Sequence, residues 1–142
     1  MAPLDAHQDD AAPRPPPAVL VVDVANVMGS RPDGWWRDRA GAATRLMAQL
    51  VPRLGSVVTT PDGVELTVAR IVAVLEGRAR HAQAPDGIDA VRATADGDAA
   101  VIALAADLLA DRWPVLVVTA DRGLRARLPS RVRVAGPRWL LG

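Results

Sequence analysis

Two short runs of branched apolar residues, each followed closely by an aspartate, constrain the fold of this chain more than any other feature. Residues 18–22 and 115–119 are continuous rather than alternating, which is typical of strands buried on both faces of a parallel sheet. Asp23 ends the first run, and Asp121 follows the second after one residue. If these strands are neighbours, both carboxylates lie at the carboxyl edge of the sheet, where ligands bind in open α/β folds.

Strand and helix patterns alternate along the rest of the chain. The turn at residues 61–63 predicts a hairpin between residues 56–60 and a strand that starts near residue 64. Further strands are expected at residues 69–75, 88–92 and 132–134, and helices at residues 36–50, 98–109 and 122–128, the first with Asp33 as its N-cap. This order predicts an α/β fold: a three-layer sandwich with a mainly parallel central sheet and an added hairpin.

The length of 142 residues suits one domain with its own core. Residues 1–17 are rich in proline, acidic and small residues, a composition that predicts a disordered tail. The domain is therefore expected at residues 18–142.

Composition excludes several classes of function. The chain has no cysteine, which removes disulfides, thiolate nucleophiles and cysteine-bound zinc. All 17 basic residues are arginine and the net charge is +1, so any affinity for nucleic acid must be local. No apolar run reaches the roughly 18 residues that span a bilayer, and the N-terminus lacks the pattern of a secretory signal. We expect a cytoplasmic protein with no membrane contact, and the sequence leaves a homo-oligomer open.

A third aspartate, Asp98, stands at the predicted start of a helix, where a loop returning from the sheet can bring it to Asp23 and Asp121. Carboxylates held close together repel one another unless a cation neutralises them. Hard oxygen ligands favour Mg²⁺ or Mn²⁺, and such a centre activates water for phosphoryl transfer. Asn26 could orient a carboxylate or a water through its amide, and Thr119 through its hydroxyl. Helix capping alone would also place acids at positions such as Asp98 and Asp121.

Residues 21–27, 97–101 and 117–124 resemble the three signature regions of NYN and PIN-like ribonuclease domains. The resemblance covers residues 18–140. It implies strand order 3-2-1-4-5 and a Mg²⁺- or Mn²⁺-dependent endoribonuclease that hydrolyses RNA phosphodiester bonds. The residues it assigns to the catalytic site are Asp23, Asn26, Asp98 and Asp121, the three aspartates being the metal ligands.

This sequence has Ala99 and Gly123 where many relatives carry further acids. Glu76, at the end of a strand expected beside the first, and Asp96 are candidates for additional ligands. A thinner site also leaves open a weak or inactive PIN-like module that binds RNA or a protein partner. A haloacid-dehalogenase-like phosphatase is a lower alternative, because it needs a second aspartate where Ala25 stands and a lysine that the chain lacks.

Trp35 and Trp36 are adjacent, so on a helix their rings diverge by about 100° and one of them is expected to be exposed. An exposed ring among arginines can stack on an unpaired base of single-stranded RNA, and a ring packed under the neighbouring loop would leave the same pattern. The candidates for substrate contact are Trp35, Arg31, Arg37, Thr119 and Arg122.

Overall fold

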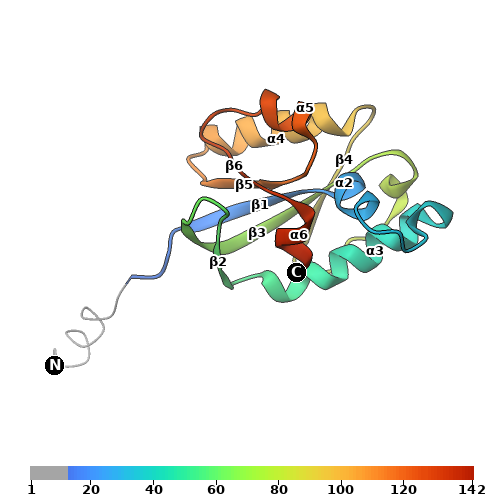
Figure 1. Cartoon of the computed structure of the whole chain (residues 1–142), viewed down its shortest axis with the longest axis horizontal. Coiled ribbons are helices and arrows are strands. Elements are labelled where there is room, and N and C mark those ends of the chain that lie inside the picture. Colours follow the sequence, from blue (N-terminus) through green and yellow to red (C-terminus); the bar gives the residue numbers. More distant parts are fainter. Residues whose placement is uncertain (1–12) are drawn as a thin grey trace.

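The structure is a computed structural model that describes residues 13–142, and it consists of a central sheet between two layers of helices (Figure 1). Five strands run parallel: β1 (Pro17–Asp23), β3 (Glu65–Leu75), β4 (Ile88–Arg92), β5 (Val115–Val118) and β6 (Arg133–Ala135). Their order is β4-β3-β1-β5-β6, which is the predicted order 3-2-1-4-5. The prediction of a mainly parallel α/β fold is confirmed.

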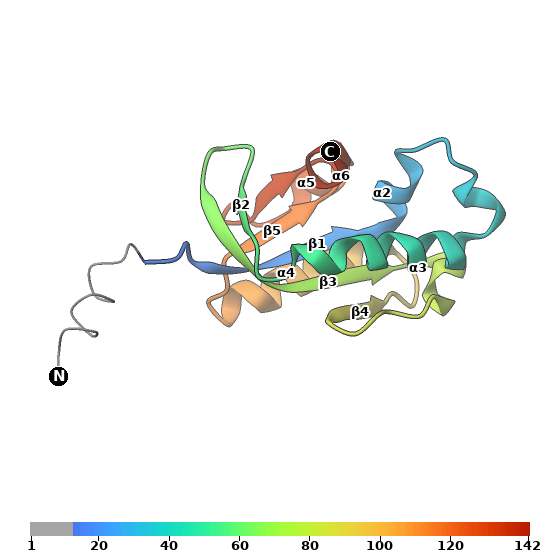
Figure 2. The ribbon, with the colours of Figure 1, turned by 90° about the horizontal axis from the view of Figure 1, so that it is seen from below.

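The predicted hairpin is also present. β2 (Val57–Thr59) pairs antiparallel with the first residues of β3, and the Thr60 hydroxyl accepts a hydrogen bond from the Val64 amide across the turn. β2 borders the beginning of β3 and β4 borders its end. The hairpin therefore extends the sheet at the end opposite α2 (Val24–Gly29), as Figure 2 shows.

Helices cover both faces of the sheet, which explains the continuous apolar runs. One face carries α2, α3 (Arg39–Leu50) and α6 (Pro137–Leu141), and the other carries α4 (Gly97–Ala110) and α5 (Arg122–Arg127) (Figure 1). Along β1, Leu20 and Val22 enter the core on the α3 side, while Val19 and Val21 enter the core on the α4 side. A strand with water on one face would need polar residues at alternate positions.

The start of the first long helix differs from the prediction. Trp36 lies in a separate 3₁₀ turn, η1 (Trp35–Arg37), and α3 begins at Arg39. Its N-cap is Asp38 rather than Asp33, because the Asp38 carboxylate accepts a hydrogen bond from the Gly41 amide at 3.0 Å. Two further 3₁₀ turns, η2 (Val51–Arg53) and η3 (Gly77–His81), follow α3 and β3.

The chain joins the sheet before the predicted boundary at residue 18. Pro17 begins β1, the Thr67 amide donates to the Pro16 carbonyl at 2.8 Å, and the Thr67 hydroxyl donates to the Pro15 carbonyl at 2.7 Å. Residues 1–12 of the predicted tail lie outside the described residues. Within residues 13–142, no helix has the length and apolar character needed to cross a membrane.

Candidate acidic site

Asp23 stands where β1 turns into α2, and its side chain is buried, with 6% of its surface exposed. One carboxylate oxygen accepts a hydrogen bond from the Thr119 hydroxyl at 2.9 Å. The other oxygen accepts a hydrogen bond from the backbone amide of Asn26 at 3.4 Å, and Asp23 is thereby the N-cap of α2. The carboxylate is therefore held from both sides by atoms of the protein.

Thr119 reaches Asp23 because β1 and β5 are adjacent and Val22 pairs with Val118. Its buried hydroxyl also accepts a hydrogen bond from the Asp121 amide at 3.1 Å. Thr119 thus connects the first and third predicted signature regions through one hydroxyl group. The sequence offered Thr119 both as a group that could orient a carboxylate or a water and as a substrate contact; in the structure its hydroxyl bonds Asp23.

Asn26 forms a second link between the same regions. Its side-chain oxygen accepts a hydrogen bond from the Ala120 amide at 2.7 Å, so α2 is joined to the loop that carries Asp121. The Asp121 carboxylate in turn accepts from the Leu124 amide at 3.0 Å and caps α5. Asn26 and Asp121 therefore have structural partners besides any role in chemistry.

The start of α4 supplies the other acids. Asp96 is the N-cap of α4, and its carboxylate accepts from the Asp98 amide at 2.9 Å. Glu76, directly after β3, accepts from the Gly97 amide at 3.0 Å. A Cβ atom at Gly97 would lie 2.7 Å from the Glu76 carboxylate carbon, so glycine is needed for this approach. In residues 13–142 the Asp98 side chain has no hydrogen-bond partner, unlike those of Asp96 and Glu76.

The charges of these acids act on one another. Burial raises the pKa of Asp23, and the nearby charges of Asp98 and Glu76 raise it further, against the hydrogen bonds from Thr119 and the Asn26 amide. We call the five carboxylates that share this neighbourhood the acidic end of the sheet: Asp23, Glu76, Asp96, Asp98 and Asp121.

The pKa of Asp98 is affected by more neighbouring charges than that of Asp23. Partial burial raises its pKa first, followed by the charges of Asp121, Asp96 and Glu76, while Arg127 opposes them. The structure thus brings the three predicted aspartates into one electrostatic neighbourhood. A divalent cation there would relieve the repulsion that raises both pKa values.

The donor set suits a hard cation, since it consists of carboxylates without histidine or cysteine. The carboxylates do not, however, close around a single point. Among residues 13–142 no three acidic or histidine side chains are arranged so that they could hold a metal ion as they stand. Asp23, Asp121 and Glu76 each turn an oxygen toward a protein donor instead.

The structure places the predicted RNA contacts in different environments. Trp36 is the exposed ring, with 51% of its surface accessible, whereas Trp35, the ring assigned to base stacking, packs against the core. Arg37 lies over the Trp36 ring, 5.9 Å from its centre. Arg31 and Arg122 are exposed.

A hollow of about 690 Å³ opens beside Trp36, and the sequence did not indicate it as a unit. It lies between η1, the start of α3 and η3, and Trp36, Arg37, Arg39, Arg78 and His81 are among the residues that line it. Because η3 begins directly after Glu76, the hollow adjoins the acidic end. Arg31 lies outside it.

Comparison with known proteins identifies the fold alone. No protein-family model and no curated protein sequence matches the chain. Among solved structures, it is similar to a tryptophan-to-leucine mutant of Rae1 (YacP) from Bacillus subtilis, with a TM-score of 0.61 and 16% identity, over 87% of this chain and 72% of that one. The strand order and this likeness together show a PIN-like α/β fold.

Proposed function

We propose that this protein is a Mg²⁺- or Mn²⁺-dependent endoribonuclease that hydrolyses RNA phosphodiester bonds at the acidic end. The observation that carries the proposal is the contact between Asp23 and Thr119 across the carboxyl ends of β1 and β5, with Asp98 and Glu76 close enough to act on Asp23. The PIN-like fold and the resemblance of the three signature regions support the same activity.

In this proposal Asp23, Asp98 and Asp121 hold the cation, with Glu76 and Asp96 as candidates for additional ligands. The cation, when bound, lowers the pKa of a water molecule and stabilises the charge that develops on the phosphate. Thr119 and Asn26 keep Asp23 and the loop of Asp121 in place through their hydrogen bonds. The Asp98 carboxylate, at the start of α4, accepts no hydrogen bond within residues 13–142 and would be available to hold the cation.

The proposed substrate is single-stranded RNA, because an unpaired base can stack on an aromatic ring while arginines hold the phosphates. The hollow beside Trp36 offers such a ring next to Arg37 and Arg78. Trp36 therefore takes the stacking role predicted for Trp35, and the exposed Arg31 and Arg122 remain proposed contacts. Thr119, which was also a candidate for substrate contact, is fully buried and acts through its hydrogen bond to Asp23 instead.

Cleavage of a mixed single-stranded RNA pool tests the proposal. We expect cleavage with Mn²⁺ or Mg²⁺, none in EDTA, and none by Asp23→Asn with Mn²⁺. Asp107→Asn is the matched control, because Asp107 is exposed on α4 away from its first turn. Activity that persists in EDTA, or that Asp23→Asn leaves intact, contradicts the mechanism.

A second candidate function is favoured by the spread of the carboxylates, since no three of them in residues 13–142 are arranged to chelate a metal. In this alternative the chain is a non-catalytic module that binds RNA or a protein partner. Metal-independent RNA binding without cleavage, unchanged by Asp23→Asn, would favour it over the nuclease.

A further inference from the structure

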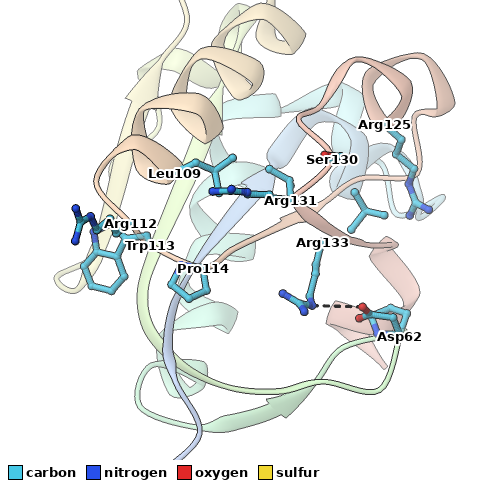
Figure 3. A pocket seen from close by; sticks show the side chains of 12 residues that line it. Asp62, Leu109, Arg112, Trp113, Pro114, Arg125, Ser130, Arg131 and Arg133 are labelled. Carbon is cyan, nitrogen blue, oxygen red and sulfur yellow. Dashed lines mark ion pairs between the residues drawn. The ribbon is translucent and has the colours of Figure 1, made fainter.

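A second and larger hollow, of about 970 Å³, lies where the hairpin, the turn between α4 and β5, and the segment from α5 to β6 meet (Figure 3). Its charged lining is unbalanced, because four arginines face one carboxylate, that of Asp62. We call it the arginine groove, after Arg112, Arg125, Arg131 and Arg133. Figure 3 shows Arg112 on one rim and Arg125 on the other, with Arg131 and Arg133 between them.

One of the four guanidinium groups is already paired. The Arg133 Nε lies 3.3 Å from an Asp62 carboxylate oxygen, which fastens the hairpin turn to β6. The hydrogen bond from the Thr60 hydroxyl, and more weakly the Arg133 charge, lower the pKa of Asp62, so this carboxylate stays ionised. Three positive charges remain without a carboxylate partner in the groove.

The side chains of two of these three arginines form no hydrogen bond or ion pair within residues 13–142. These two, Arg112 and Arg131, are exposed. Arg112 also has a φ of 68°, the only left-handed backbone among the non-glycine residues described. Glycine adopts this conformation without strain, so the turn alone does not call for an arginine.

The third unpaired arginine connects the groove to the acidic end. Arg125 donates through Nε to the Thr119 carbonyl at 2.8 Å, and the hydroxyl of the same Thr119 donates to Asp23. The other end of the Arg125 guanidinium lies near Gly136, just beyond β6. The groove therefore extends along β6 from Arg125, which contacts Thr119, to Pro114 just before β5.

We propose that the arginine groove binds phosphate groups of the same RNA strand that is cut at the acidic end, several nucleotides from the scissile bond. This inference rests on the proposed function. Guanidinium groups match the oxygens of a phosphodiester in charge and geometry. Because the net charge of the chain is only +1, affinity for RNA has to come from a local cluster of positive charge such as this one.

Binding of RNA of two lengths tests the groove without cleavage. The probes are fluorescent oligouridylates of about 4 and about 16 nucleotides, the range of single-strand sites, and anisotropy is measured in EDTA at several salt concentrations. The variant is Arg112→Gly with Arg131→Ala, because glycine suits the left-handed backbone at position 112. Arg45→Ala, exposed on α3 over the opposite face of the sheet, is the control.

We expect the double variant to bind the long RNA about tenfold more weakly, with a salt slope lower by about 1.4, or about 0.7 for each lost phosphate contact. Binding of the short RNA, and all binding by Arg45→Ala, stay as in wild type. Equal losses for both lengths, or no loss for the long RNA, overturn the proposal. So does displacement of the long RNA by polyglutamate or inorganic phosphate at matched charge, which indicates an acidic protein or a free anion as the occupant.

Failure of this inference is distinguishable from failure of the proposed nuclease. If the short RNA is cleaved with Mn²⁺ but the double variant binds long RNA normally, the groove is rejected and the nuclease stands. If no RNA is cleaved while the double variant loses affinity for long RNA alone, the chain is an RNA-binding module that uses the groove.

Discussion

The acidic end has two halves that are built differently. In the first, Asp23 is buried and accepts hydrogen bonds from Thr119 on the neighbouring strand and from the α2 backbone. In the second, the exposed Asp96 and the half-buried Asp98 lie at the start of α4, and Glu76 reaches the Gly97 amide from the end of β3. One half is thus part of the core, and the other is a group of like charges at the surface.

This difference assigns the two halves different tasks. The half around Asp23 keeps its geometry without a cation, because neutral donors hold the carboxylate in place. In the half around Asp98, burial and the charges of Asp121, Asp96 and Glu76 raise the pKa of Asp98, and a cation would relieve this repulsion. We infer that a bound metal ion would leave Asp23 where it is and draw the α4 acids toward it.

Thr119→Val gives the largest expected effect, because it removes the hydroxyl that serves both Asp23 and Asp121. A buried carboxylate that loses its donor costs about 1–3 kcal/mol of unfolding free energy, and the displaced Asp23 lowers cleavage as well. Denaturant unfolding and RNA cleavage measure the two effects. Thr119→Ser keeps the hydroxyl and is the control. If valine and serine behave alike, the half around Asp23 is not held by this hydrogen bond.

Gly97→Ala changes only the second half and gives a smaller effect on stability. The new Cβ would lie 2.7 Å from the Glu76 carboxylate, so Glu76 must withdraw and lose its bond to the residue 97 amide. The loss of about 1 kcal/mol is offset by the better helix propensity of alanine. We expect affinity for Mn²⁺ to fall about tenfold, as when a group that orients a ligand is removed.

Gly29→Ala is the matched control for Gly97→Ala, since its Cβ would meet only Trp35 at an ordinary distance of 3.8 Å. Calorimetric titration with Mn²⁺ compares the two variants. Equal affinities in both would show that Glu76 takes no part in holding the cation.

The half that belongs to the core is also the half that the sequence predicted best. The runs that became β1 and β5 are apolar on both faces, and their last residues fall at one edge whenever the strands are parallel neighbours. Asp23 and Asp121 could therefore be placed at one edge from strand ends alone, whereas the hydrogen bond from Thr119 to Asp23 was not predicted. No helix was predicted at α2, because six residues are too few to show a helical period.

Side-chain detail outside the strands was not predictable in the same way. Asp33 and Asp38 are both of a residue type that caps helices, and Asp38 is the cap because α3 begins at Arg39. The same holds for Trp35 and Trp36, whose exposure depends on the 3₁₀ turn between the α2 loop and α3. The arginine groove joins residues from the hairpin, α4, α5 and β6, so no sequence window contains it.

The smallest expected effect is a pH dependence of stability that arises from both halves. Burial is the first cause of the raised pKa in Asp23 and in Asp98. An unfolded aspartate titrates near 3.8, so the folded chain binds these protons at a higher pH than the unfolded chain does. These two groups therefore destabilise the fold increasingly as the pH rises from 3.8 through their raised pKa values. At pH values above the raised pKa values, their destabilising contribution no longer changes with pH.

We expect the free energy of unfolding to rise modestly when the pH is lowered from about 7 toward the unfolded value of 3.8, opposite to the acid sensitivity of ion-paired carboxylates. Asp62 does not mask this rise, because its pKa is lowered and its contribution is lost only at more acidic pH. Asp23→Asn removes the part due to the core half and leaves the part due to Asp98, so urea unfolding of the two proteins at both pH values separates the halves. Saturating Mn²⁺ neutralises the same charges at pH 7 and should flatten the profile of the wild type. A wild-type stability profile that falls as the pH is lowered over this range and is unchanged by Mn²⁺ would show that the acids at this edge do not act on one another.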